Sequence, residues 1–426
     1  MRILHVVPAY HPEGPGGIER TTRALVCAQR ERGDEPLVLC GASTTRPACT
    51  LVEETVDGVP VLRLHRDRGE FEHPGRARHA EVEALFLRVL AARAPDVVHV
   101  HHWLRLSTAL VRCAHAVGVP SVVTLHDHAM SCPRAYRVDH TGATCTRRRD
   151  PSVCVACVPR GEGDSEESLL TDLRRLARDL GAELDLARVV LVSQPATRVL
   201  LADLGGLDAA RFEVLPLGVP RRFGDAAPLP LRSTAGRPVR IASWGRQSRD
   251  KGSIVLAATA RELVELGVVF ELDLFGEVDA TEGFADRLAA SLRGLPVRLH
   301  GPYNSADLLS AQPDLAVFAS LAMETHGLVI DEAIELGLPC VVACGGAIAD
   351  RLGSGALVVP PGDPRRLARA LALLAGSDAL RGDLVGRCPP LAPAPAEHAA
   401  ALEAVYRRAI APLASARRHA RPSTPP

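Results

Sequence analysis

The sequence predicts an α/β protein made of two doubly wound domains. Short apolar runs alternate with longer amphipathic segments along nearly the whole 426-residue chain. Such alternation is typical of parallel strands joined by helices that cover both faces of a sheet. It is interrupted at residues 219–238, where proline, glycine and arginine dominate, and we interpret this segment as a linker between the domains.

The first domain is predicted to span residues 1–218. Its expected strands are at residues 2–8, 36–40, 59–64, 96–100, 121–125, 188–192 and 212–216. Its expected helices are near residues 18–32, 82–92, 107–117, 169–180 and 195–204. The glycine loop after the first strand lacks a G-x-G-x-x-G fingerprint, and the second strand ends without an acidic residue. Both absences disfavour an NAD-dependent oxidoreductase.

The second domain is predicted to span residues 239–393 and repeats the alternation. Its expected strands are at residues 240–244, 270–275, 297–300, 315–320, 340–343 and 357–359. Its expected helices are at residues 253–266, 283–293, 305–311, 327–336, 364–375 and near 380. We expect a C-terminal helix at 394–413 and a disordered tail at 414–426. Two domains of this kind are expected to face a cleft that holds the active site.

The composition excludes several classes of function. Fifty acidic residues balance fifty basic ones, and the pI is near 7.3, which disfavours a nucleic-acid or anionic-membrane binder. Aromatic residues make up only 3%, too few for a base-stacking platform. No apolar run is long enough for a membrane span, and the start lacks a signal-peptide pattern. A cytoplasmic protein is therefore expected; its oligomeric state is left open.

A cysteine-rich loop at residues 132–159 interrupts the first domain. Four cysteines are spaced C-x12-C-x8-C-x2-C, at Cys132, Cys145, Cys154 and Cys157. Four thiolates ending in C-x2-C are able to hold a structural zinc ion. A loop of free thiols explains the same residues equally well, so both alternatives stay open.

Lys251 is the only lysine in the chain, although Lys and Arg together number 50. It lies in a glycine-bearing loop with Arg246, between a predicted strand and a predicted helix. An ammonium is a compact point charge suited to phosphate oxygens, and a helix start after such a loop is a place to bind an anion. We therefore favour a phosphate site over a surface loop that carries a lysine by chance.

A second polar stretch follows the predicted strand at 315–320. Glu324 precedes a helix and Glu332 lies within it, with the free N–H groups of Gly327 and Leu328 between them. Two carboxylates on either side of a helix N-terminus suit the hexose and the ribose of a nucleotide sugar. In the alternative interpretation, Glu324 only complements the helix dipole and Glu332 belongs to a solvated face.

Together these motifs resemble the retaining glycosyltransferases of family 4, which have the GT-B fold. G-R-x4-K-G covers Gly245 to Gly252, and E-x7-E covers Glu324 to Glu332. The resemblance extends over nearly the whole chain. It includes the sequence LVVPPGD at 357–363, together with Gly16-Gly17, His126-Asp127 and Gly345-Gly346.

The resemblance implies a role for each of these residues. Arg246 and Lys251 hold the donor diphosphate, Glu324 contacts the transferred hexose, and Glu332 contacts the ribose. His126 lies beside the reacting sugar, and Gly16 and Gly17 are counted with the donor-binding residues, as are Gly327 and Leu328. His326 departs from the family, which usually has an aromatic residue there. His101, His102, His115 and His128 fit no motif, so we leave them as surface or core histidines.

The chain contains no D-x-D triplet, the pair of aspartates that typically holds a metal ion on the diphosphate, so we expect a metal-independent enzyme. The resemblance implies a retaining transferase that moves a hexose-type sugar from a UDP or GDP donor. A soluble small molecule or saccharide is a more suitable acceptor than a lipid, because the sequence has no basic amphipathic face. A sugar-nucleotide epimerase on the same fold and a non-catalytic sugar-nucleotide sensor remain alternatives.

Overall fold

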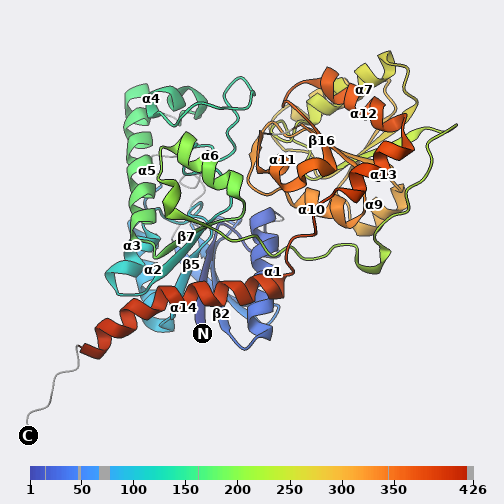
Figure 1. The fold of residues 1–426 in the computed structure, drawn as a ribbon. Helices are drawn as coiled ribbons and strands as arrows, with labels where there is room; N and C mark the ends of the chain where they lie inside the picture. Colours follow the sequence, from blue (N-terminus) through green and yellow to red (C-terminus); the bar gives the residue numbers. More distant parts are fainter. Residues whose placement is uncertain (15, 47–48, 67–76, 162, 344, 420–426) are drawn as a thin grey trace, which may run out of the picture. The chain divides into compact units, whose positions relative to one another are not determined.

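The computed structural model describes residues 1–426 except 15, 47–48, 67–76, 162, 344 and 420–426 (Figure 1). The chain divides into two compact units. The first contains Met1–Pro133, Arg148–Pro220 and Pro393–Pro426, and the second contains Arg134–Arg147 and Arg221–Ala392. Each unit has a β-sheet of its own with helices on both faces, so each is a Rossmann-like domain.

The first unit contains an eight-stranded sheet in the order β3-β4-β2-β1-β5-β6-β7-β8. Its strands are β1 Arg2–Val7, β2 Glu35–Gly41, β3 Thr50–Val56, β4 Val59–His65, β5 Val97–Val100, β6 Ser121–Leu125, β7 Val189–Val192 and β8 Phe212–Val214. Every pairing is parallel except that of β3 with β4. The sequence does not predict β3, because this half-exposed edge strand has no apolar run that would indicate it.

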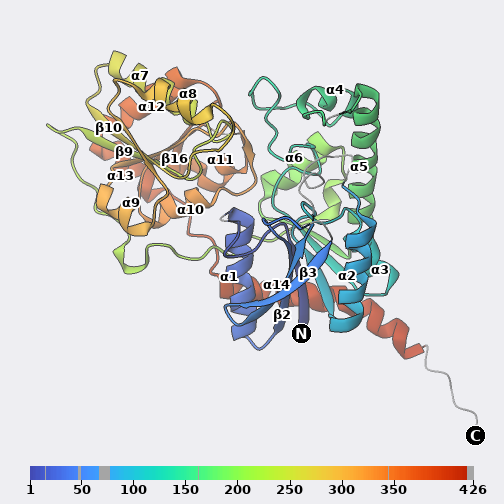
Figure 2. The same ribbon diagram turned by 180° about the vertical axis from the view of Figure 1, so that it is seen from behind.

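Helices cover both faces of this sheet, as Figure 1 and Figure 2 show. They are α1 Gly17–Glu31, α2 Ala80–Arg93, α3 Leu110–Ala116, α4 Pro151–Cys154, α5 Glu166–Leu186, α6 Pro195–Gly205 and α14 Pro395–His419. Strand alternation separates the two cores: Leu4 packs with α2, α3 and α5, whereas Ile3 packs with α1 and α14. The C-terminal helix thus returns to the first unit.

Helix α14 extends to His419, so residues 414–419, which were expected to be disordered, belong to the helix; residues 420–426 lie outside the described residues. None of the helices in the described part of the chain is long and apolar enough to cross a membrane.

The second unit contains a parallel sheet in the order β11-β10-β9-β12-β14-β16. Its strands are β9 Val239–Trp244, β10 Phe270–Phe275, β11 Val297–Gly301, β12 Leu315–Phe318, β14 Cys340–Ala343 and β16 Ala356–Val359. Two short strands, β13 Met323–Glu324 and β15 Gly345–Gly346, pair beside it. The direction of winding reverses between β9 and β12, which makes their carboxyl ends the switch point where such sheets bind ligands.

Seven helices of the second unit flank this sheet: α7 Ser253–Glu265, α8 Phe284–Leu292, α9 Ser305–Ala311, α10 Leu328–Glu335, α11 Ala347–Leu352, α12 Pro364–Ala375 and α13 Asp378–Gly386. Helices α7 and α12 pack in one apolar core, through Leu256 and Leu367 among others. Helices α9, α10 and α11 pack in a second core, through residues such as Ile330. With both faces covered by apolar cores, polar side chains of this sheet gather at the ends of its strands.

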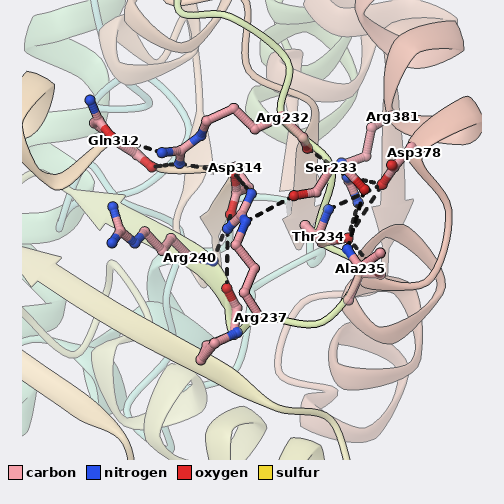
Figure 3. Close-up of polar contacts among 12 residues, drawn as sticks. Arg232, Ser233, Thr234, Ala235, Arg237, Arg240, Gln312, Asp314, Asp378 and Arg381 are labelled. Carbon is pink, nitrogen blue, oxygen red and sulfur yellow. Dashed lines mark hydrogen bonds and ion pairs between the residues drawn. The ribbon is translucent and has the colours of Figure 1, made fainter.

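From Arg221 onward, the segment interpreted as a linker at 219–238 is part of the second unit. Figure 3 shows its anchor, the carboxylate of Asp314, whose side chain is 2% exposed. Arg232 lies 3.0 Å from this carboxylate and Arg237 2.7 Å, while the backbone N–H of Arg240 donates to it at 2.9 Å. Burial alone would raise the pKa of Asp314, but the bond from Arg237 and the N–H of Arg240 outweigh it and hold that pKa below its usual range.

We expect Asp314→Asn to lower the free energy of unfolding at pH 7 by about 1–3 kcal/mol, because it leaves two guanidinium groups with a weakened partner. A carboxylate whose pKa is lower in the folded than in the unfolded protein contributes stability at pH values above its unfolded-state pKa. That contribution is lost as the pH falls through the folded-state pKa. The difference from wild type should therefore shrink below about pH 4. Urea unfolding at several pH values measures it, with Glu265→Gln on the exposed side of α7 as the matched control. An equal loss at all pH values would contradict the role of the charge.

Candidate functional site

Two loops meet at the switch point of the second sheet. One follows β9 and carries Arg246 and Lys251, and the other follows β12 and leads to Glu324 in β13. Strands β9 and β12 are direct neighbours, with Leu315 paired to Ile241. Because parallel neighbours end at the same edge, the two motifs recognised in the sequence lie side by side.

Gly252 explains how closely these loops approach each other. Its φ of +76° lies in the left-handed region, and a Cβ at this position would lie 1.8 Å from the carbonyl oxygen of Ala319. The backbone N–H groups of Leu321 and Ala322 donate to the carbonyl of Asp250 at 2.8 and 3.0 Å. Lys251 is therefore held between two residues that are fixed to the neighbouring loop.

Lys251 and Glu324 form an ion pair, with Nζ 2.5 Å from Oε1. The hydroxyl of Ser320 donates to the same oxygen at 2.9 Å. Burial lowers the pKa of Lys251, but the Glu324 carboxylate more than compensates, so the net shift is upward and the ammonium stays charged. The structure thus brings together the two residues that the sequence assigns to diphosphate and hexose.

Arg246 lies on the same loop but is held less firmly. Its side chain is 52% exposed, and its guanidinium is 3.9 Å from Asp250 and 3.7 Å from Asp279. Distances of this length at an exposed site contribute little to stability. The guanidinium can therefore exchange these carboxylates for an incoming anion at small cost.

Glu332 lies in α10 and is only 1% exposed. Its Oε2 accepts hydrogen bonds from Trp244 Nε1 at 2.7 Å and from Arg222 at 3.0 Å. It does not belong to a solvated helix face. Arg222, which also donates to the hydroxyl of Tyr303 at 3.1 Å, is a partner that the sequence did not indicate, because it lies in the segment interpreted as a linker. Gly327, with a φ of +74°, caps α10, and Leu328 is its first residue.

His326, which stands where the resembled family has an aromatic residue, is buried in an ion-pair network. Its Nε2 lies 2.7 Å from Asp331, whose other oxygen lies 2.7 Å from Arg351. Burial would raise the pKa of Asp331, but His326 and Arg351 outweigh it and lower that pKa. These contacts tie His326 to α10, the helix that carries Glu332.

Residues 134–147 of the cysteine-rich loop belong to the second unit and border this site. The N–H of Met323 donates to the carbonyl of Tyr136 at 3.2 Å, and the hydroxyl of Thr144 donates to the carbonyl of Leu321 at 2.6 Å. Val138 packs against Leu321. Nothing in the sequence of this loop indicated that it lies beside Glu324, because single backbone contacts of this kind leave no periodic pattern.

Among the described residues, the sulfur atoms of Cys132, Cys154 and Cys157 are not all within 4.8 Å of one another. Cys145 belongs to the second unit and the other three belong to the first. Among the residues the structure describes, the only histidine, cysteine or acidic side chains gathered in threes within 4.8 Å are His5, His99 and His101. The geometry thus gives no support to the structural zinc site considered from the sequence.

In the first unit, His126 and Asp127 directly follow β6, and each contacts a histidine that follows β5. His126 Nε2 lies 2.9 Å from His101 Nδ1, and Asp127 Oδ2 lies 2.9 Å from His102 Nε2. His101 and His102 fit no motif in the sequence. Their position at the end of a strand predicted next to that of His126 was the signal that could have identified them.

Gly16 and Gly17 form the N-terminus of α1 in the first unit. A Cβ at Gly16 would lie 2.3 Å from a carboxylate oxygen of Glu19. Burial raises the pKa of Glu19 despite a hydrogen bond to its own backbone. A carboxylate therefore lies over the start of this helix, as the dipole favours.

Both halves of the chain match glycosyltransferase families. Residues 16–218 match the family described as "Glycosyl transferase 4-like domain", and residues 238–377 match "Glycosyl transferases group 1". Among curated proteins, none matches the sequence.

Solved structures share the fold at low sequence identity. The α,α-trehalose-phosphate synthase (UDP-forming) from Burkholderia xenovorans in complex with glucose-6-phosphate is 14% identical, with a TM-score of 0.66 over 96% of this chain and 100% of that one. Sucrose-phosphate synthase from Thermosynechococcus elongatus is 17% identical, with a TM-score of 0.63 over 98% of each chain. The catalytic domain of starch synthase IV from Arabidopsis thaliana bound to ADP and acarbose is 14% identical, with a TM-score of 0.63 over 96% and 99%.

The two Rossmann-like units, the ion pair at the switch point and these matches all support the same family assignment. The chain belongs to the glycosyltransferases: it is a GT4-like enzyme with the GT-B fold.

Proposed function

We propose that this enzyme transfers a hexose-type sugar from a UDP or GDP sugar to a hydroxyl or similar nucleophile of an acceptor, with retention of configuration and without a catalytic metal. A soluble small molecule or saccharide is the proposed acceptor. The observation that carries the proposal is the pairing of the only lysine with Glu324, 2.5 Å apart at the switch point. An ammonium and a carboxylate at this edge suit the two ends of a sugar–phosphate bond.

In this proposal, the donor replaces contacts that exist in the free protein. The diphosphate takes the ammonium of Lys251 from Glu324 and the guanidinium of Arg246 from its distant carboxylates. Glu324 then accepts hydrogen bonds from the hexose hydroxyls. Glu332 is already fixed by Trp244 and Arg222, so it would meet the ribose as a rigid acceptor.

The chemical step follows from these roles. The bond between the anomeric carbon and the leaving phosphate oxygen breaks, and the acceptor oxygen bonds to the same face of that carbon. The acceptor proton passes to the departing phosphate, so charge and atoms balance without an enzyme nucleophile. Lys251, Arg246 and the N-terminus of α10 stabilise the negative charge that grows on the diphosphate. His126 is the proposed neighbour of the reacting sugar.

A panel of UDP, GDP, ADP and TDP sugars, screened by thermal shift and followed by an acceptor screen, tests the proposal. We expect a UDP or GDP sugar to raise the melting temperature, and free nucleoside diphosphate to form with acceptor. The anomeric configuration of the product, read by NMR, then tests retention. Epimerised donor without an acceptor, or binding without any turnover, would overturn the proposal in favour of an epimerase or a sensor.

We expect transfer to continue in the presence of EDTA. The chain has no D-x-D pair to hold a cation, and in this proposal Lys251 and Arg246 hold the diphosphate instead. Initial rates with and without EDTA provide the measurement. A prompt loss of activity that magnesium or manganese restores would contradict metal independence.

Lys251→Ala should weaken binding of bare UDP or GDP roughly 10- to 100-fold, because one charge-assisted hydrogen bond is lost. Lys251→Arg should not restore turnover, because the site needs a compact point charge in a tight glycine loop and a guanidinium is a planar fork. Titration calorimetry and steady-state rates measure the two effects. Near-wild-type turnover in the arginine variant would show that a point charge is not needed.

Glu324→Gln and Glu332→Gln should fail in different ways. Glu324→Gln removes the partner that neutralises Lys251, so bare nucleoside diphosphate should bind as well as before or more tightly, while kcat falls. Glu332→Gln should weaken binding of the bare nucleotide, which contains the ribose. It should also lower the melting temperature, because Arg222 loses a buried partner. The opposite pattern of nucleotide binding would reverse the donor orientation proposed here.

A further inference from the structure

A buried chain of hydrogen bonds lies beneath His126 in the first unit. It joins side chains from β1, α1, the end of β5, β6 and α14, all nearly inaccessible to solvent except the terminal one. In order, its members are Thr124, His99, Tyr406, Gln29, His5, His101 and His126.

The half of this hydrogen-bond chain that leads to His126 starts at the amide of Gln29. Gln29 Oε1 lies 2.7 Å from His5 Nε2, and His5 Nδ1 lies 3.1 Å from His101 Nε2. His101 Nδ1 then lies 2.9 Å from His126 Nε2. Both ring nitrogens of His5 and of His101 are therefore engaged.

Burial keeps these imidazoles neutral. It lowers the pKa of His5 to about 4, despite the bond to Gln29, and holds those of His99 and His101 well below the usual range. A neutral imidazole has one donor and one acceptor nitrogen. In a row of neutral imidazoles, all hydrogen bonds therefore run from donor to acceptor in the same direction. Once the donor at one end is known, the tautomer of every ring in the row follows.

The distances around Gln29 fix that direction. Its Nε2 lies 3.3 Å from the hydroxyl of Tyr406, which lies 2.7 Å from His99 Nδ1. The hydroxyl has a single proton to donate, and the 2.7 Å contact with His99 Nδ1 suits that donation better than the 3.3 Å contact with Gln29. Gln29 thus turns its NH₂ group to Tyr406 and its oxygen to His5. His5 must donate from Nε2, His101 from Nε2, and His126 from Nε2.

A metal ion explains the cluster less well. His5, His99 and His101 do have ligand atoms within 4.8 Å of one another. All six of their ring nitrogens, however, already have hydrogen-bond partners within the hydrogen-bond chain. A metal ion would have to break at least one bond at each residue.

We propose that Gln29, oriented by Tyr406, is a positioning residue that fixes His126 as the Nε2–H tautomer through His5 and His101. Nδ1 of His126 is then a hydrogen-bond acceptor. This inference deepens the proposed function and rests on it in one respect, the placement of His126 beside the reacting sugar. There, an Nδ1 without a proton accepts a hydrogen bond from a sugar hydroxyl, whereas the other tautomer presents an N–H to it.

NMR of the full-length protein labelled with ¹⁵N-histidine tests the tautomer directly, without donor or acceptor. The His126 signals are assigned by their loss in His126→Gln. We expect the proton on Nε2 in the wild-type protein and a mixture of both tautomers in Gln29→Met. Tyr406→Phe, which removes the group that orients the amide, should give a mixture too, and it serves if Gln29→Met does not fold.

Ser121→Ala is the matched control, because Ser121 lies on the same strand as Thr124 but is not a member of the hydrogen-bond chain. It should leave the proton on Nε2 of His126. An Nδ1–H form in the wild-type protein would overturn the proposal. So would a proton that stays on Nε2 in both Gln29→Met and Tyr406→Phe. Because no substrate is present, these outcomes do not depend on whether the proposed transfer reaction is correct.

Kinetics test the link to the reaction. An even mixture of tautomers leaves half of the molecules competent, so kcat of Gln29→Met should fall about twofold or more, with KM for the donor unchanged. Gln29→Glu keeps an acceptor toward His5 and should restore the Nε2–H tautomer and part of kcat. An unchanged kcat in a variant with mixed tautomers would overturn the assigned role of Nδ1.

Discussion

A parallel sheet that is covered on both faces leaves only the strand ends for polar chemistry, and the candidate site depends on this constraint. Apolar cores with α7 and α12 on one side, and with α9, α10 and α11 on the other, occupy the faces of the second sheet. Charged side chains therefore gather after β9 and β12. Lys251 and Glu324 meet there and neutralise each other, and Gly252 permits the close backbone approach that this contact requires.

Local pattern was sufficient to predict most of this architecture. The strands and helices of both units follow apolar runs and amphipathic periods, and the proximity of Lys251 to Glu324 follows from motifs at neighbouring strand ends. The contacts that escaped prediction join residues far apart in the sequence. Arg222 reaches Glu332 from a supposed linker, and residues 134–147 attach to the second unit through isolated hydrogen bonds and the packing of Val138. Neither leaves a periodic signal, and β3 lacks an apolar run.

The buried histidines of the first unit are exceptions to the placement of polar groups at strand ends, and each therefore needs a hydrogen-bond partner. His5 and His99 point into a face of the sheet that α1 and α14 cover, where an unpaired polar group would be costly. They are satisfied in series by Gln29 and by Tyr406, which lies 377 residues further along the chain. The sequence shows each histidine but not these partners, because helix faces far apart in the chain supply them. The return of α14 to the first unit is thus part of the surroundings of His126.

The scarcity of lysine has a practical consequence for chemical modification. Apart from the N-terminal amine, which is paired with Asp34, Lys251 carries the only primary amine in the sequence. Among the side chains of this sequence, an amine-directed reagent therefore has one target, and it lies in the candidate site. Protection of that amine by a bound ligand would report site occupancy directly, without a radioactive label or any assay of turnover.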